Sequence, residues 1–309
     1  MEIRKDIKNY SEEIIRIAYE HYKREISSME RMSIQPSEIF KKYLNDKLHE
    51  INGLVYLENG ACRGYLLYNN WQESTELYCR IPEWGYGAES EKREKIISYL
   101  FQALAEEFVG EKPVNFSVNL YAHDVEMQRL FSFMEFGMQA ETGIYLLKET
   151  VDASTDKIKV LEKAELENRW DEVWSLLSQL VNHLKKSPVF YPGEEFTEEV
   201  YKEFFADEGT RVYIAEDESK IIGLIASNPD ELLPVFATGE SANVGEVFVL
   251  PEYRGQKIAE ALLAYVKKDL LKSNYRYAWV EHGTANPNAR YFWNKYFSTY
   301  KYEMIRRIQ

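Results

Sequence analysis

Internal repetition is the feature that most constrains how this chain can fold. Four segments of the first half recur in the second half, and each pair shares a strand pattern or an amphipathic helix pattern. The pairs are GLVYLENGACRGYLLY (from Gly53) with TRVYIAEDESKIIGLIAS (from Thr210), TELYCRIPEWG (from Thr75) with GEVFVLPEYRG (from Gly245), IISYLFQALAEEF (from Ile96) with IAEALLAYVKKDL (from Ile258), and QRLFSFMEFGM (from Gln128) with ARYFWNKYFST (from Ala289). Because the matches keep their order and a nearly constant offset, the sequence predicts a duplicated structural plan.

The length of the chain agrees with a duplication. The 309 residues suit two domains of roughly 150 residues each. The polar, unpatterned segment Glu149–Lys157 falls where the first copy should end. We therefore expect one domain over residues 1–150 and a second over residues 151–309.

The second copy reads as a mixed α/β fold. Apolar alternation predicts strands and 3.6-residue periodicity predicts helices. The expected strands are 158–163, 211–216, 221–227, 244–250, 277–281 and 300–308, and the expected helices are 168–186, 197–206, 258–271 and 287–296. In the third helix Ile258, Leu262, Tyr265 and Val266 share one face, as expected for a helix that covers a sheet. The predicted fold class is α/β with a mixed sheet that begins antiparallel.

Composition excludes several classes of function. A net charge of −13 opposes binding to nucleic acid or to an anionic membrane. No apolar run reaches the length of a signal peptide or a membrane span, so we expect a cytoplasmic protein. Cys62 and Cys79 have neither CxxC spacing nor a nearby histidine cluster, which predicts no metal site and no disulfide. The sequence does not indicate an oligomeric state.

The segment GEVFVLPEYRGQKIAEALL, residues 245–263, carries the strongest chemical signal. A strand ends at Pro251, a short loop follows, and an amphipathic helix begins. The free N–H groups and the positive dipole end of such a helix start form a site for a phosphate or a diphosphate. Arg254 and Lys257 add positive charge there, although solvated loop charges would give the same pattern.

The loop YRGQKIA resembles the CoA pyrophosphate loop of the GNAT superfamily of N-acyltransferases. Arg254 and Ala259 match the first and last positions of that motif, and Lys257 replaces its first glycine. The resemblance implies two tandem GNAT-like domains, of which the second uses acetyl-CoA as cosubstrate. It also implies that backbone amides of Val247–Val249 hold the pantetheine and polarise the thioester carbonyl. The implied cofactor-binding residues are Val247, Phe248, Val249, Arg254, Gly255, Gln256, Lys257, Ile258, Ala259, Asn286 and Trp293.

A second resemblance to the same superfamily lies in NPNARYFWNKYF, residues 286–297. Asn286 followed by Pro287 is also a helix N-cap followed by a proline at the first helical position, so capping and CoA contact are both open. Members of the family often have a tyrosine in this helix that protonates the departing thiolate, and Trp293 stands at the matching position. Tyr296 is a possible substitute acid, or a packing residue.

Acyl transfer also needs a base, because a lysine-like amine has a pKa of roughly 10.4 and is protonated at neutral pH. Glu246 stands on the strand that the resemblance places beside the thioester. His282 stands at the end of the next strand, in WVEHGTAN. Each could instead be a surface or strand-end polar residue. Either could accept the proton, directly or through a chain of water molecules.

The first copy lacks these features. Its corresponding loop, IPEWGYGAESEKREK, contains Gly85 and Gly87 but no matching arginine, and its acidic residues oppose phosphate. Val125 aligns with Asn286. We therefore expect a degenerate GNAT-like domain that supports the active one.

These observations predict an N-acetyltransferase that moves an acetyl group from acetyl-CoA to a small-molecule amine or a peptide, by direct attack. One alternative is a sensor or scaffold that binds CoA without turnover. Another is an enzyme that uses an aminoacyl or other acyl donor.

Overall fold

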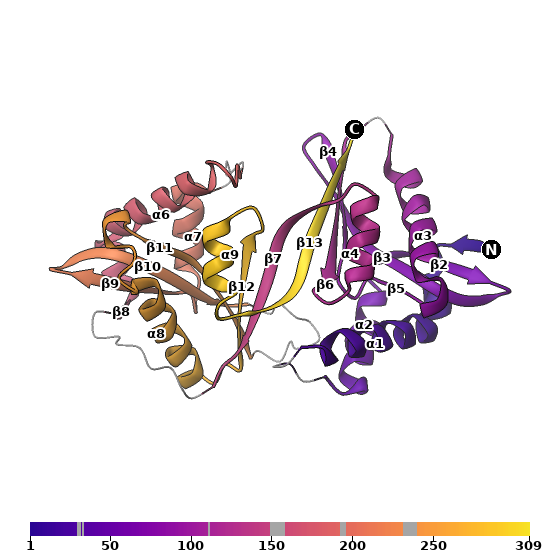
Figure 1. Cartoon of the computed structure of the whole chain (residues 1–309), viewed down its shortest axis with the longest axis horizontal. Coiled ribbons are helices and arrows are strands. Elements are labelled where there is room, and N and C mark those ends of the chain that lie inside the picture. Colours follow the sequence, from indigo (N-terminus) through magenta and orange to yellow (C-terminus); the bar gives the residue numbers. More distant parts are fainter. Residues whose placement is uncertain (30–31, 33, 111, 149–157, 192–195, 231–239) are drawn as a thin grey trace. The chain divides into compact units, whose positions relative to one another are not determined.

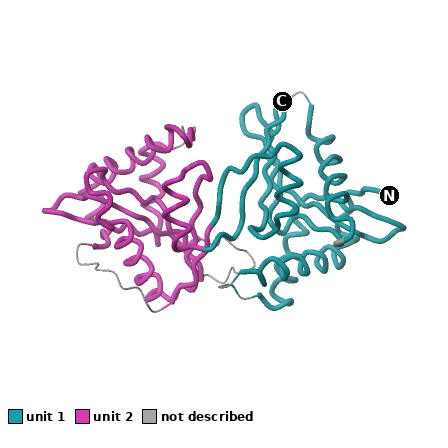
Figure 2. The backbone as a smooth tube through the Cα atoms, in the orientation of Figure 1, with its two compact units in different colours: residues 1–142, 298–309 teal, residues 143–297 magenta. Residues whose placement is uncertain are grey.

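The computed structural model describes residues 1–309 except 30–31, 33, 111, 149–157, 192–195 and 231–239. The described chain forms two compact units (Figure 2). Unit 1 comprises Met1–Thr142 and Ser298–Gln309, and unit 2 comprises Gly143–Phe297. The expected boundary at residue 150 falls outside the described residues and stays a prediction.

Unit 1 is a mixed sheet with helices on its faces. Its strands are β1 (Glu2–Arg4), β2 (Asn52–Glu58), β3 (Ala61–Glu73), β4 (Glu76–Ile81), β5 (Tyr86–Ala88), β6 (Val114–Tyr121), the first part of β7 (Gly137–Leu146) and β13 (Ser298–Ile308). Its helices are α1 (Ser11–Ser27), α2 (Ser37–Leu48), α3 (Arg93–Phe108) and α4 (Val125–Phe133), with 3₁₀ turns at Ile7–Tyr10 and Ser90–Lys92. The strand order is β1-β2-β3-β4-β6-β13, with β5 beside β3. The pair β4 and β6 is parallel.

Consecutive buried residues in β3 explain the helix layers of unit 1. Tyr65, Leu66, Leu67 and Tyr68 are all buried, although neighbouring side chains of a strand point to opposite faces. Both faces of β3 must therefore be covered. Helices α1 and α3 both contact β3 and provide this cover (Figure 1).

Unit 2 has the same kind of architecture. Its strands are β8 (Ile158–Leu161), β9 (Arg211–Asp217), β10 (Lys220–Pro229), β11 (Ser241–Val249) and β12 (Tyr277–Gly283), in the order β12-β11-β10-β9-β8. Its helices are α5 (Lys163–Asn168), α6 (Trp170–Leu184), α7 (Glu198–Ala206), α8 (Ile258–Lys272) and α9 (Pro287–Trp293), with a 3₁₀ turn at Pro251–Tyr253. The pair β11 and β12 is parallel, whereas β8, β9, β10 and β11 are antiparallel neighbours. Helices α6 and α7 lie on one side of these strands and α8 on the other (Figure 1).

Most of the predicted elements of the second copy are confirmed. The mixed α/β class is confirmed, and in α8 the predicted face has Leu262 and Val266 fully buried. Two details differ. The predicted helix 168–186 is preceded by a separate short helix, α5, and the predicted helix 287–296 ends at Trp293. Tyr296 therefore lies in the turn after α9, where its N–H donates to Trp293 O at 2.9 Å.

The last strand does not stay with the unit that precedes it in the sequence. β13 pairs antiparallel with β6 of unit 1, from Lys301 opposite Tyr121 to Ile308 opposite Val114. In return, β7 enters unit 2 from Gly143 onward, and the N–H of Leu147 donates to Arg276 O at 2.9 Å. Apart from β5, the order helix-helix-strand-strand-strand-helix-strand-helix-strand occurs twice, from α1 to β7 and from α6 to β13. Each compact unit thus includes strand residues from the other half of the chain.

Among the described residues, no helix combines the length and apolar character that crossing a membrane requires.

Candidate active site

The parallel strands β11 and β12 are paired only over the first part of their length and then diverge. Their pairing runs from Ser241 opposite Tyr277 to Asn243 opposite Trp279, whereas β11 continues to Val249 with β10 as its partner. Within the described part of the chain, Val247–Val249 therefore have a ladder on one side only. Backbone groups on the other side can meet a ligand laid between the two strands.

A β-bulge lies just past the last paired residue. Gly245 is opposite Ala226 and Phe248 is opposite Leu224, so Glu246 and Val247 together face Ile225 alone. Glu246 has a φ of 52°, in the left-handed region that side chains other than glycine rarely adopt. A bulge bends its strand and redirects a side chain, and such bulges are common beside active sites.

The carboxylate of Glu246 is held by a residue that the sequence analysis did not identify. The hydroxyl of Tyr201, on α7, donates a hydrogen bond to Oε2 of Glu246 at 2.9 Å. Burial raises the pKa of Glu246 above its ordinary value, and the Tyr201 hydrogen bond acts in the opposite direction. A carboxylate whose pKa moves toward neutrality is a better general base. No motif in the sequence marked Tyr201, because it lies 45 residues before its partner.

His282 stands at the corresponding level of β12. Glu246 and His282 each lie three residues beyond the last pair, Asn243 opposite Trp279. His282 is buried, with 8% of its surface exposed. The structure therefore brings both predicted bases to the diverging ends of adjacent strands, and their roles stay predictions.

The predicted pyrophosphate loop follows directly from β11. Arg254, Gly255, Gln256 and Lys257 are all exposed, and Ile258 and Ala259 begin α8 as partly buried residues. The N-cap of α8 makes no side-chain hydrogen bond, so the first N–H groups of the helix keep their capacity for a ligand. A helix start of this kind is suited to bind phosphate groups.

The two basic residues of the loop are placed differently. Nε of Arg254 donates to Val249 O at 3.1 Å, and its guanidinium lies 5.4 Å from the centroid of the Phe248 ring, so Arg254 braces the end of β11 against the loop. Lys257 has a φ of 60° in the place where the family motif has glycine. The glycine conformation is therefore retained by a lysine, at a cost of about 1 kcal/mol.

A glycine on β10 allows the elements of this loop to approach. A Cβ at Gly223 would lie 3.2 Å from Phe248 O, 3.2 Å from Val249 Cγ2 and 3.3 Å from Ile258 Cγ2. The end of β11 and the start of α8 thus meet over a position without a side chain. Their spacing fixes the loop relative to the diverging strands.

Asn286 and Trp293 both make structural contacts within unit 2. Oδ1 of Asn286 accepts from the N–H of Ala289 at 3.3 Å, so the predicted N-cap is confirmed, and contact with CoA stays a prediction. Trp293 is 3% exposed and packs edge-on against Phe297. The Tyr296 ring centroid lies 5.0 Å from Nζ of the buried Lys267. The structure places Trp293 in the core, and a role for it at the cofactor stays untested.

In unit 1 the equivalent strands do not diverge. Pairing between β4 and β6 continues to Ile81 opposite Val118, at the end of β4. The chain then folds back as β5, which pairs with β3. The N-cap of α4 is Asp124, whereas Asn286 caps α9, so the residue that corresponds to Asn286 is Asp124 and not Val125.

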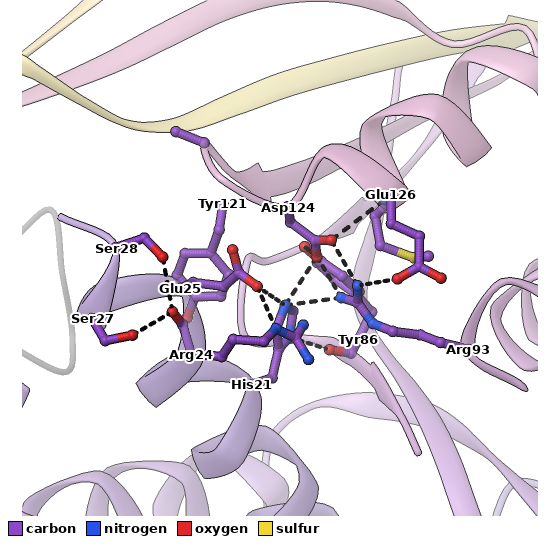
Figure 3. Close-up of polar contacts among 12 residues, drawn as sticks. His21, Arg24, Glu25, Ser27, Ser28, Tyr86, Arg93, Tyr121, Asp124 and Glu126 are labelled. Carbon is purple, nitrogen blue, oxygen red and sulfur yellow. Dashed lines mark hydrogen bonds and ion pairs between the residues drawn. The ribbon is translucent and has the colours of Figure 1, made fainter. Parts of the chain in front are cut away.

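A buried ionic network links α1, β5, α3 and the N-cap of α4 in unit 1 (Figure 3). Nη1 of Arg93, the first residue of α3, donates to Oδ1 of Asp124 at 2.7 Å, and the Tyr86 hydroxyl donates to Oδ2 at 3.0 Å. Nε2 of His21 lies 2.9 Å from the same oxygen, and 3.7 Å from Oε1 of Glu25. Exposure of Arg93, Asp124, His21, Glu25 and Tyr86 is 5% or less in each case.

At neutral pH Asp124 is ionised and His21 is neutral in this network. Burial alone would raise the pKa of Asp124, but hydrogen bonds from Arg93 and His21 outweigh it and hold the pKa below its usual range. Burial lowers the pKa of His21 to about 4. Ligand atoms of His21, Glu25 and Asp124 lie within 4.8 Å of one another, a spacing that suits a cation, and the Arg93 guanidinium already supplies positive charge to Asp124.

A protein-family model matches part of the second half of the chain. The family model described as "Acetyltransferase (GNAT) family" matches residues 177–298, which include the diverging strands, the loop and Asn286. No curated protein sequence matches the chain.

Solved structures resemble the chain in fold. A GCN5-related N-acetyltransferase from Sphaerobacter thermophilus is similar over 100% of this chain and 96% of its own, with 12% identity and a TM-score of 0.57. The GCN5-related glucosamine N-acetyltransferase region of a fungal multi-domain GH3 beta-N-acetylglucosaminidase is similar over 99% of this chain, with 13% identity and a TM-score of 0.57. This chain covers 38% of that fungal protein. At such identities the likeness concerns the fold alone, which spans both units.

Proposed function

We propose that this chain is an acyltransferase of the GNAT superfamily and transfers an acetyl group from acetyl-CoA to a primary amine, with the chemistry in unit 2. The observation that carries the proposal is the divergence of β11 from β12 after Asn243, which leads into an exposed loop and an uncapped helix start. These features suit a thioester whose pantetheine follows β11 and whose diphosphate meets α8.

The residues around the loop would bind the cosubstrate. N–H groups at the start of α8, with Arg254 and Lys257, would meet the diphosphate. Backbone amides of Val247–Val249 would hydrogen-bond to the pantetheine and to the thioester carbonyl oxygen. Donors fixed in this way stabilise the negative charge that forms on that oxygen during attack.

The reaction then needs one proton acceptor. The amine nitrogen attacks the thioester carbonyl carbon, a C–N bond forms, the C–S bond breaks, and CoA leaves as a thiolate. Glu246 takes the proton that the amine loses, directly or through water. A thiol has a pKa of roughly 8.5, so the thiolate leaves without an obligatory acid and takes a proton from solvent or from a group such as Tyr296.

A covalent enzyme intermediate on cysteine does not fit this chain. Cys62 and Cys79 are both buried in unit 1, with 3% and 1% exposed. Burial raises the pKa of Cys62 to about 11 and that of Cys79 to about 12. Both thiols are therefore protonated at neutral pH and poorly nucleophilic.

Calorimetric titration with acetyl-CoA and an assay of thiol release with a panel of amines test the proposal. We expect binding, and release of one thiol for each amine acetylated. Absence of acetyl-CoA binding by the intact chain would refute the assignment. We expect unit 1 to bind no acetyl-CoA. Its strands β4 and β6 stay paired to the end of β4, and the Arg93 guanidinium is already hydrogen-bonded to Asp124.

One observation favours a second function, a sensor that binds CoA without turnover. Lys257 occupies a left-handed position in which the family motif has glycine. A side chain at this position can shift the place where the diphosphate binds, and thereby the position of the thioester relative to the acceptor amine. Binding of acetyl-CoA without thiol release for any amine would select the sensor.

A further inference from the structure

The general base of the proposed reaction stands on a bulge, and its side chain needs support from elsewhere. We propose that Tyr201 is a positioning residue for Glu246, which holds the carboxylate in the orientation that accepts a proton from the acceptor amine. This inference rests on the proposed function of unit 2. It assigns a role to α7, which lies outside the loop and strand motifs of the family resemblance.

The geometry of the pair supports this role. The Tyr201 hydroxyl donates to Oε2 of Glu246 at 2.9 Å, and Tyr201 is 4% exposed. A hydrogen bond to one carboxylate oxygen fixes the plane of the group and leaves Oε1 to take the proton. Because Tyr201 is an uncharged donor, it stabilises the ionised carboxylate without competing with it for that proton.

Packing explains why the Tyr201 hydroxyl is well placed. Tyr201 and Phe205 lie one turn apart on the buried face of α7, with ring centroids 6.1 Å apart. The Tyr201 ring also lies 6.0 Å from the Trp174 ring and 6.1 Å from the Phe196 ring. These three aromatic neighbours restrict the rotation of the ring, so the hydroxyl is preorganised toward β11.

Several charged groups on the surrounding elements form ion pairs away from Glu246. The ion pairs are Arg169 with Glu172 of α6, Glu252 with Lys220 of β10, Lys295 with Glu260 of α8, and Arg211 with Asp269 of α8. On β12, His282 stands at the level of Glu246. Tyr201 is the titratable side chain that the structure places in hydrogen-bond contact with Glu246.

The test replaces Tyr201 by phenylalanine, which removes the hydroxyl and keeps the ring. Loss of a hydrogen bond to the ionised form raises the pKa of the carboxylate, so we expect the acid limb of the kcat/KM profile to move up by about one pH unit. Tyr213→Phe is the matched control. Tyr213 is a fully buried tyrosine of the same unit whose hydroxyl donates to Asp269 Oδ2 at 2.8 Å, so its variant loses a buried hydrogen bond without touching Glu246.

A second readout separates this inference from the proposed function. In protein labelled with ¹³C at the glutamate carboxyl carbons, the Glu246 resonance is assigned by its loss in Glu246→Gln. We expect its titration midpoint to rise by about one unit in Tyr201→Phe and to stay unchanged in Tyr213→Phe. This measurement needs neither acetyl-CoA nor turnover. An unchanged midpoint in Tyr201→Phe would overturn the role of Tyr201, whereas absence of acyl transfer with an intact shift would overturn only the function.

Discussion

The buried histidine of unit 1 should make the stability of this protein depend on pH. His21 is 5% exposed, and burial lowers its pKa to about 4, against an ordinary value of about 6.5. Below about pH 6.5 the unfolded chain takes up a proton that the folded unit refuses, so stability falls as the pH falls toward 4. The linkage relation gives a loss of about 2 kcal/mol between pH 7 and pH 5.

The perturbation is His21→Gln, which keeps a polar group near Asp124 and does not titrate. We expect the variant to be less stable than the parent at pH 7, and its stability to lack the histidine contribution between pH 7 and pH 5. Glu25, whose pKa burial raises, acts in the opposite sense in both proteins. The difference between variant and parent therefore isolates His21.

Urea unfolding at pH 7 and pH 5 measures this difference, and hydrogen exchange of peptides from α1 and β6 assigns the transition to unit 1. The control is His49→Gln, an exposed histidine after α2, which we expect to keep the parent's pH dependence. If the free energy of unfolding fell by the same amount between pH 7 and pH 5 in His21→Gln and in the parent, the claim that His21 is buried in its neutral form would be refuted.

Three further predictions address the loop, a glycine and the last strand. Arg254→Ala removes the hydrogen bond to Val249 O and a cation of the loop, so we expect acetyl-CoA to bind about tenfold more weakly in calorimetric titrations. The control Lys272→Ala, at the far end of α8, should leave the affinity unchanged. Gly64→Ala would place a Cβ 2.5 Å from Ile96 Cγ2. We expect this overpacking to lower the free energy of unfolding by about 1–3 kcal/mol in urea titrations, and an equally stable variant would contradict the close packing. Deletion of residues 298–309 removes the partner strand of β6, so hydrogen exchange should accelerate in β6 and spare β10; equal protection of β6 would refute the pairing.

Local patterns in the sequence were enough for the elements and for the loop. The strand that ends before Pro251, the exposed turn and the helix from Ile258 follow from short-range rules of periodicity and chain breaking. Asn286 capped α9 as predicted, because capping depends on residues three positions apart. Glu246 and His282 became candidates because the resemblance placed their strands beside the thioester, and the structure puts both at the diverging ends of β11 and β12.

Long-range contacts decided the rest. Tyr201 contacts Glu246 only because α7 packs beside β11. The Asp124 network forms only when α1, β5, α3 and the start of α4 come together in unit 1. The pairing of β13 with β6 was beyond the sequence, since an amphipathic strand at a chain end satisfies either duplicated sheet equally well by pattern. The sequence by itself determined the duplicated plan and the loop between β11 and α8, because these depend on neighbours along the chain. Tertiary structure alone decided which unit the last strand completes and which hydroxyl holds the glutamate, because these depend on side chains that only folding brings together.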